Sequence, residues 1–202
     1  MEKSSVIRFG GGAALLAGLF LSVFVAFFYH PGSWVLEVME PRMILTSAIC
    51  HIGFYAGIYA LYRAESEPRS GKVGVFVGLA GVLVYLIGGI LSGATLGWTT
   101  NLFPDVAQRP DWPIYLSGTG FLLFYLGSLL VGVETLIRRK FKTWTGSLLV
   151  LAPVIAVQTL ITRYRLMWIA VGLIGILIAV AVLTDRSAPA QAAPFESGNE
   201  TA

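Results

Sequence analysis

A stripe of polar side chains runs along one apolar segment of the chain, residues 43–62. Its members are four residues apart, which places them on one slowly turning helical face, and they are Ser47, His51, Tyr55 and Tyr59. His51 lies near the middle of this segment, where an ionisable side chain in a membrane favours ligand binding or proton transfer. The structural alternative, which is the more ordinary one, is a neutral His51 that donates one hydrogen bond and accepts another.

The sequence offers little metal or cofactor chemistry. His30 and His51 are the two histidines. Their depths in the membrane differ by about ten helical residues, or ~15 Å along a helix axis, which disfavours haem ligation by both. Cys50 is the only cysteine, so an intramolecular disulfide and a cysteine-cluster metal site are excluded. The sequence lacks phosphate-binding, zinc-protease and serine-hydrolase motifs. We therefore predict no cofactor, no metal and no catalytic residue, and an enzyme is not the favoured class.

Two further polar side chains lie within the apolar segments of the chain, and both have an ordinary structural interpretation. Glu134 precedes Arg138 by one helical turn, which favours an ion pair at a membrane surface. Gln158 follows Pro153 and is placed to bridge backbone groups that the proline frees, or else to contact a substrate.

The elements that must position these residues are long and apolar. Of the 202 residues, 56% are hydrophobic and 12% are charged, against about 25% charged in an ordinary soluble domain. About 20 apolar residues are needed to cross the hydrocarbon core, and helix is the conformation that satisfies a single segment's backbone there. Six segments qualify, and they are residues 9–29, 43–62, 73–97, 114–137, 144–162 and 166–184.

The predicted fold is therefore all-α: a polytopic transmembrane bundle of about six spans in one domain, residues 1–185. Residues 186–202 are rich in Pro, Ala and polar side chains and are predicted to form a disordered cytoplasmic tail. The fifth segment carries Pro153, so a re-entrant or kinked segment is its alternative. The apolar run that ends at Tyr29 is too long for the core of a signal peptide, and we interpret it as a retained first span.

Basic residues predict the orientation in a cell membrane. With the N-terminus inside, ten Lys and Arg fall in cytoplasmic segments and four fall outside, which favours cytoplasmic positions for both termini. The run at 138–142 is the strongest anchor, whereas Arg163 and Arg165 on the outer side disagree with this orientation. The net charge of +3 is thus explained by membrane topology, and no nucleic-acid partner is expected.

Small residues predict where helices approach each other closely. Gly53 and Gly57 lie on a small face of the second segment, and Gly89, Gly93 and Gly97 form a ridge in the third. Such faces serve folding within the chain or self-association between chains.

A short motif hints at an internal duplication of helical hairpins. Phe54-Tyr55-Ala56-Gly57 recurs seventy residues later as Phe124-Tyr125-Leu126-Gly127. Each copy follows a segment that begins near a Trp and ends with an acid and a Pro.

Two stretches resemble a diffuse group of uncharacterised bacterial six-span integral membrane proteins. The first is FGGGAALLAGLFLSVFVAFFYHP, which ends in His30-Pro31, and the second is GFLLFYLGSLLVGVETLIRRKFKTWTGSLLVLAPVIA, whose basic turn ends at Trp144. The resemblance covers residues 8–184 and departs from the group where a proline often precedes the arginine of the basic turn. It implies the six-span architecture and carries no activity.

Three functions are compatible with these patterns. The leading hypothesis is a non-catalytic accessory or binding subunit that packs with a lipid-like ligand, with partner helices or with a second copy of the chain. The alternative is a small oligomeric transporter or proton-coupled permease that uses the polar stripe of residues 43–62, with His51 as the titrating group. A third is a membrane enzyme acting on lipid head groups through Asp105, Arg109 and Asp111, although exposed charges of this kind are usually only solvated.

Overall fold

The chain folds as an all-helical bundle. The computed structural model describes residues 3–28, 41–64, 71–93, 112–138, 143–162 and 165–184, all of them helical. They form α1 (Lys3–Phe28), α2 (Pro41–Ala64), α3 (Gly71–Gly93), α4 (Trp112–Arg138), α5 (Thr143–Thr162) and α6 (Arg165–Thr184). Each predicted segment coincides with one helix, so the all-α prediction is confirmed. The predicted tail, residues 186–202, lies outside the described residues.

Four of the helices in the described part of the chain are long and apolar enough to cross a membrane. Their apolar portions are Ser5–Ala26, Ile44–Arg63, Gly71–Ser92 and Trp112–Ile137. The apolar portions of the other two are shorter, Trp144–Gln158 and Trp168–Thr184. The composition of α1 to α4 is therefore that of a membrane protein.

Proline positions explain where two helices begin. Pro41 is the first residue of α2 and Pro113 is the second residue of α4. A proline in the first turn removes an N–H that has no partner within the helix, and its fixed backbone angle suits helix entry. Pro153 instead lies inside α5, where it removes a hydrogen bond that the helix would otherwise make.

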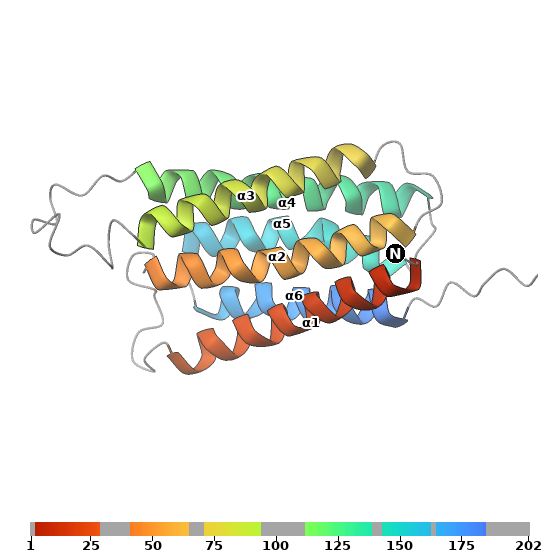
Figure 1. Ribbon diagram of the computed structural model, residues 1–202, viewed down its shortest axis with the longest axis horizontal. Helices are drawn as coiled ribbons and strands as arrows, with labels where there is room; N and C mark the ends of the chain where they lie inside the picture. The colour runs from red at the N-terminus through yellow and green to blue at the C-terminus, as the bar shows by residue number, and fades with distance from the viewer. Residues whose placement is uncertain are drawn as a thin grey trace, which may run out of the picture.

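The helices form a closed ring in which each helix packs against the next one along the chain, and α6 packs back onto α1. Figure 1 shows them running side by side along the long axis of the molecule, with consecutive helices in opposite directions. Only α2 also packs across the ring, on α4 and α6. The residues of α2 are thus placed to reach the centre of the described bundle.

The largest interface, between α3 and α4, is built on glycines spaced by seven residues. Gly74, Gly81 and Gly88 of α3 face α4, and Gly120 and Gly127 of α4 face α3. A methyl group at Gly81 would lie 2.7 Å from the backbone carbon of Leu123. The two backbones therefore touch without side chains between them, which is how small residues bring membrane helices together.

Glycines and alanines also join α1 to its two neighbours. Gly53 and Gly57 of α2 face α1, where an added methyl would lie 2.5 Å from the Ala17 Cβ and 2.8 Å from the Ala14 Cβ, respectively. On the other side of α1, a methyl at Gly18 would lie 2.6 Å from the Gly172 carbonyl oxygen of α6. These small faces are thus occupied by packing within the chain.

The predicted ridge of Gly89, Gly93 and Gly97 has a different setting. A methyl at Gly89 would make only ordinary contacts with α2, 3.4 Å from the Leu45 Cα. Gly93 is the last residue of α3, and Gly97 lies outside the described residues. The close contact of α3 in the structure is made by its other glycine row, Gly74, Gly81 and Gly88.

Among helices that follow each other in the chain, α5 and α6 share the smallest interface, which we call the α5–α6 seam. The glycines of these two helices face elsewhere: Gly146 faces α4, Gly172 faces α1 and Gly175 faces Phe54 of α2. Nothing comparable to the glycine rows of α3 and α4 therefore draws the two backbones together along this seam.

Candidate functional site

The imidazole of His51 lies at the centre of the bundle, enclosed by aromatic rings. Its side chain is 0% exposed. The ring centroids of its aromatic neighbours lie 4.9 to 5.5 Å away, and these neighbours are Phe54, Tyr85, Phe121, Phe124 and Tyr125. They come from α2, α3 and α4, so His51 joins three helices through edge and tilted ring contacts.

Both nitrogens of the imidazole have a hydrogen-bond partner. The His51 Nδ1 lies 2.6 Å from the Ser47 carbonyl oxygen, and Nε2 lies 3.1 Å from the Tyr125 hydroxyl. Since a carbonyl oxygen only accepts, Nδ1 carries the proton and donates it, which leaves Nε2 to accept from Tyr125. This is the neutral imidazole that donates once and accepts once, with the second bond crossing from α2 to α4.

Serine and tyrosine hydroxyls extend this group into a small polar network. The Ser47 hydroxyl lies 3.5 Å from His51 Nδ1, and the ring of Tyr85 on α3 packs edge-on against the imidazole at a centroid distance of 5.2 Å. On the far side of Phe121, the indole of Trp168 on α6 packs at a centroid distance of 5.9 Å. A buried polar network with partners for its members adds rigidity and fixes how the helices fit together.

The chemistry open to this site is narrow. The five aromatic residues around the imidazole are themselves buried, from Phe121 at 1% exposed to Tyr125 at 5%. Within the described helices, there is no group of three or more His, Cys, Asp or Glu residues able to hold a metal ion. The arrangement therefore suits a helix-joining role better than contact with a solute.

The predicted stripe on α2 divides into a buried half and an outer half. Ser47 and His51 are fully buried, whereas Tyr55 is partly buried and Tyr59 is 38% exposed. A spacing of four residues advances about 40° beyond a full turn, so three steps rotate the stripe by about 120°. The rings of Tyr55 and Tyr59 stack on each other at 6.2 Å instead of entering the His51 site.

Gln158 does not join the His51 site, because its side chain is exposed on α5. The carbonyl group that Pro153 leaves without its helical donor is that of Leu149, four residues earlier. The hydroxyl of Ser128 on α4 donates to this oxygen at 3.2 Å. A neighbouring helix thus supplies a donor to the carbonyl that Pro153 leaves free, and the bridging role of Gln158 stays a prediction.

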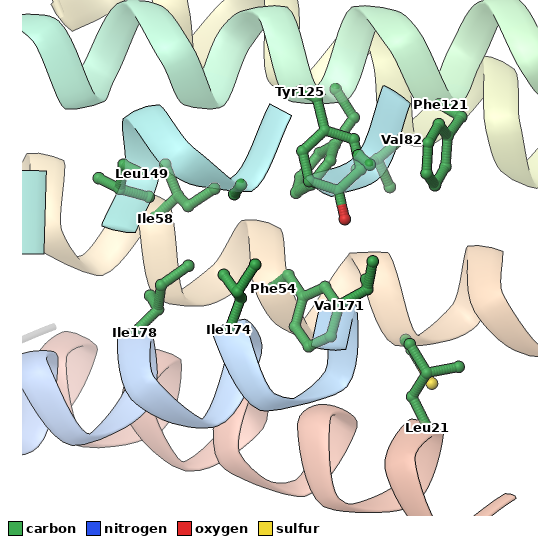
Figure 2. Close-up of a cluster of buried hydrophobic side chains, with 14 of the residues drawn as sticks. Leu21, Phe54, Ile58, Val82, Phe121, Tyr125, Leu149, Val171, Ile174 and Ile178 are labelled. Atoms are coloured by element: carbon green, nitrogen blue, oxygen red, sulfur yellow. The ribbon is translucent and has the colours of Figure 1, made fainter. Parts of the chain in front are cut away.

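A small cavity of about 10 Å³ lies beside Tyr125, on the α6 side of the core. Its lining comes from α2, α4, α5 and α6 and consists of Phe54, Ile58, Phe124, Tyr125, Ser128, Ala152, Val171, Ile174, Gly175 and Ile178. In Figure 2, the Tyr125 hydroxyl points toward Phe54 and Val171, and Ile174 and Ile178 reach from α6 toward Ile58. The cavity is therefore almost wholly apolar.

Glu134 is buried beside the first residue of α3. Its side chain is 8% exposed, and its Oε2 lies 2.6 Å from where a methyl would stand on Gly71, the first residue of α3. The free N–H groups and positive end of a helix N-terminus favour a nearby carboxylate. Glu134 thus stabilises the start of α3, while the side chain of Arg138 lies outside the described residues. His30, Asp105, Arg109 and Asp111 also lie outside them.

The sequence singled out Ser47 beside His51 but did not identify the aromatic partners of the imidazole. Tyr125 and Phe124 carried a signal, because they belong to the second copy of the Phe-Tyr motif of α2. The same shift of seventy residues pairs Ser47 with Ser117 and His51 with Phe121. Gly57 and Gly127, which close the two copies, each face the preceding helix, α1 and α3 respectively. This equivalence supports the predicted duplication.

Comparison with known proteins adds no relative. No protein-family model matches the chain, and no curated protein or solved structure matches it either. The resemblance to bacterial six-span proteins therefore stays a prediction.

Proposed function

We propose that this is a six-span protein of the cell membrane, with both termini in the cytoplasm, that acts as a non-catalytic accessory or binding subunit. The apolar lengths of α1 to α4 support membrane insertion. With 20 residues each, α5 and α6 are ~30 Å long at 1.5 Å per residue, which matches the hydrocarbon thickness. The excess of basic residues in alternate connections supports the orientation.

The observation that carries this proposal is the enclosure of His51. Both nitrogens of His51 already make hydrogen bonds, one with Ser47 and one with Tyr125, and aromatic rings surround the imidazole. A carrier that used His51 as its titrating group needs access to that group from a membrane surface. The polar centre instead serves to hold α2, α3 and α4 in one arrangement, which leaves the outer faces for binding.

The outer faces of α1 and α4 have the features of a helix-binding surface. Phe9 and Leu16 of α1 are about 70% exposed, as is Tyr115 of α4. Between such side chains, Gly12 and Gly118 have nothing within 4 Å of the position of an added methyl. Small positions flanked by large apolar side chains allow a helix of another chain to approach closely.

Purification in a mild detergent tests the proposal, with lipids and proteins that copurify identified by mass spectrometry. We expect a bound lipid or partner, or a homo-oligomer, and we expect Gly12→Leu or Gly118→Leu to weaken the protein association. Leu122→Ile on the same face of α4 is the matched control and leaves association unchanged. A monomer that carries neither lipid nor partner would contradict the proposal.

Solute flux separates this proposal from a His51-coupled permease. In proteoliposomes with an imposed pH gradient, we expect no protein-dependent proton flux for the wild-type chain. Flux that disappears in His51→Ala, while the variant keeps its helical content, would replace the binding function with transport.

A further inference from the structure

We propose that the α5–α6 seam opens to the bilayer and admits the end of one lipid hydrocarbon chain into the cavity beside Tyr125. The inference deepens the proposed binding function and rests on it, since it names the class of ligand and where it enters. Four observations, on the cavity lining, on α5, on the seam and on its outer flanks, point to this occupant.

The first observation is the chemistry of the cavity lining. Only Tyr125 and Ser128 carry side-chain polar groups, and these two hydroxyls already donate to His51 and to the Leu149 carbonyl. A water molecule in this space would have only the oxygens of these two hydroxyls to donate to and no donor to accept from, the lower limit of the two to four polar partners that a buried water needs. The lining from Phe54, Ile174 and Ile178 instead matches hydrocarbon. The volume, about 10 Å³, is too small for a chain unless the seam widens.

The second observation concerns α5, the thinner wall of the cavity. Of the lining residues, α5 supplies only Ala152, whereas α6 supplies Val171, Ile174, Gly175 and Ile178. Pro153 follows Ala152 directly and removes one helical hydrogen bond, and prolines are the common site of bends in helices. On the α5 side, the cavity wall therefore consists of the methyl group of Ala152. This residue lies next to Pro153, where the helix bends easily.

The third observation is the weakness of the seam itself. The glycines of both helices face α1, α2 and α4, so the two backbones are not locked along this line as α3 and α4 are. Separating α5 from α6 breaks the smallest interface between consecutive helices, while each keeps its larger partner, α4 for α5 and α1 for α6. An opening at this place disturbs the ring least.

The fourth observation is that the outer flanks of the seam are apolar. Leu151 and Val154 of α5 are exposed at 48% and 62%, and Leu173 and Leu177 of α6 at 50% and 42%. In a membrane these side chains contact lipid chains directly. A lipid hydrocarbon chain that enters the seam therefore moves from the apolar outer flanks to the apolar cavity lining. It gains dispersion contacts with that lining.

Photolabelling tests the proposal in nanodiscs of phosphatidylcholine and phosphatidylglycerol that contain a trace of stearic acid with a diazirine on its terminal carbon. We expect label on Ala152, Ile174 and Ile178 as well as on the lipid-facing positions. Ile174→Ala enlarges the cavity, so more carbons of the labelled fatty acid fit into it, and each carbon that enters gains dispersion contacts. The label on the other lining residues should therefore rise by about twofold or more. Ala152→Val fills the cavity and should lower it by a similar factor.

The two variants separate binding from stability, because both disturb the core but they are expected to change the labelling in opposite directions. Leu177→Ala is the matched control, because it removes side-chain carbons from the lipid-facing side of α6. It should leave the amount of label on the cavity-lining residues unchanged. If Ile174→Ala does not fold, Ile178→Val supplies the enlarged cavity.

The proposal is overturned if the lining residues carry no label, or if their label is the same in all variants. It is also overturned if a high-resolution map shows a single water in the cavity. Any of these results leaves the binding function standing when lipid or partner still copurifies, so the two proposals fail separately.

Discussion

The α3–α4 interface and the α5–α6 seam are built from similar apolar helices, yet they pack in opposite ways. In the first, Gly81 and Gly127 bring the two backbones into contact. In the second, the glycines face other helices, and a cavity lies behind Ala152. Because lipid chains are as apolar as the helices, hydrophobicity does not decide between these outcomes, and the fit of small residues does. One bundle thus contains a rigid pair and a separable pair.

The largest effect should come from filling the rigid interface. Gly127→Leu places four carbons against the backbone of α3 at Gly74 and Gly78, and we expect a loss of about 3 kcal/mol or more in the free energy of unfolding. Unfolding in mixed micelles with increasing SDS measures it. Gly118→Leu on the same helix meets open space and should change stability by less than about 0.5 kcal/mol. Equal losses for both would remove the distinction between the rigid interface and its surroundings.

The next largest effect concerns the hydrogen bond between His51 of α2 and Tyr125 of α4, which we call the His51 link. His51→Ala leaves a cavity and removes the partner of Tyr125, and should destabilise the protein by about 3 kcal/mol. Tyr125→Phe removes only the hydrogen bond and should cost ~1 kcal/mol. The same unfolding assay measures both, with Tyr115→Phe, an exposed tyrosine, as the control. A His51→Ala variant as stable as wild type would show that the link is dispensable.

A smaller effect is expected at Ser128, which satisfies the carbonyl that Pro153 frees. Ser128→Ala should destabilise the protein by about 0.6 kcal/mol. In a Pro153→Ala background the helix regains its own donor, so the same change should then cost less. A double-mutant cycle in the SDS assay measures this coupling. Additive losses would mean that Ser128 and Pro153 act independently.

The smallest effect is expected at the start of α3. Glu134→Gln removes a charge from the positive end of the helix and should cost about 0.5 kcal/mol. Gly71→Ala places a methyl against the same carboxylate and should be tolerated better when Glu134 is shortened to Ala. Gly71→Ala, Glu134→Ala and their combination form a second double-mutant cycle. If Gly71→Ala lowers the free energy of unfolding equally with Glu or Ala at position 134, the contact between Gly71 and the Glu134 carboxylate is contradicted.

The helices and the central place of His51 could be predicted from the sequence, because they depend on properties of single segments. Apolar length marks each helix, and a histidine near the middle of 43–62 must lie at mid-depth if the segment spans the membrane. The six-span topology and its orientation stay predictions. Helix-to-helix fit was harder to predict, since it depends on two segments at once.

The glycine rows show why this fit was missed. Gly89, Gly93 and Gly97 drew attention through their spacing of four, but such a row turns about 40° per step around the helix. A row spaced by seven turns about 20° per step in the other direction, and a slight supercoil keeps it facing one neighbour. Gly74, Gly81 and Gly88 follow that spacing, and their partners Gly120 and Gly127 repeat it. Similarly, Ser128 has no sequence feature that links it to Pro153.

The ring order has a consequence for biogenesis. During synthesis each new helix meets the one made just before it, so most of the assembly proceeds between sequence neighbours. The contact of Gly18 with Gly172 joins α1 to α6, so it forms only after α6 has been made. Until then Gly18 has no backbone to pack against, and the bundle stays open on the side of α1 that faces away from α2.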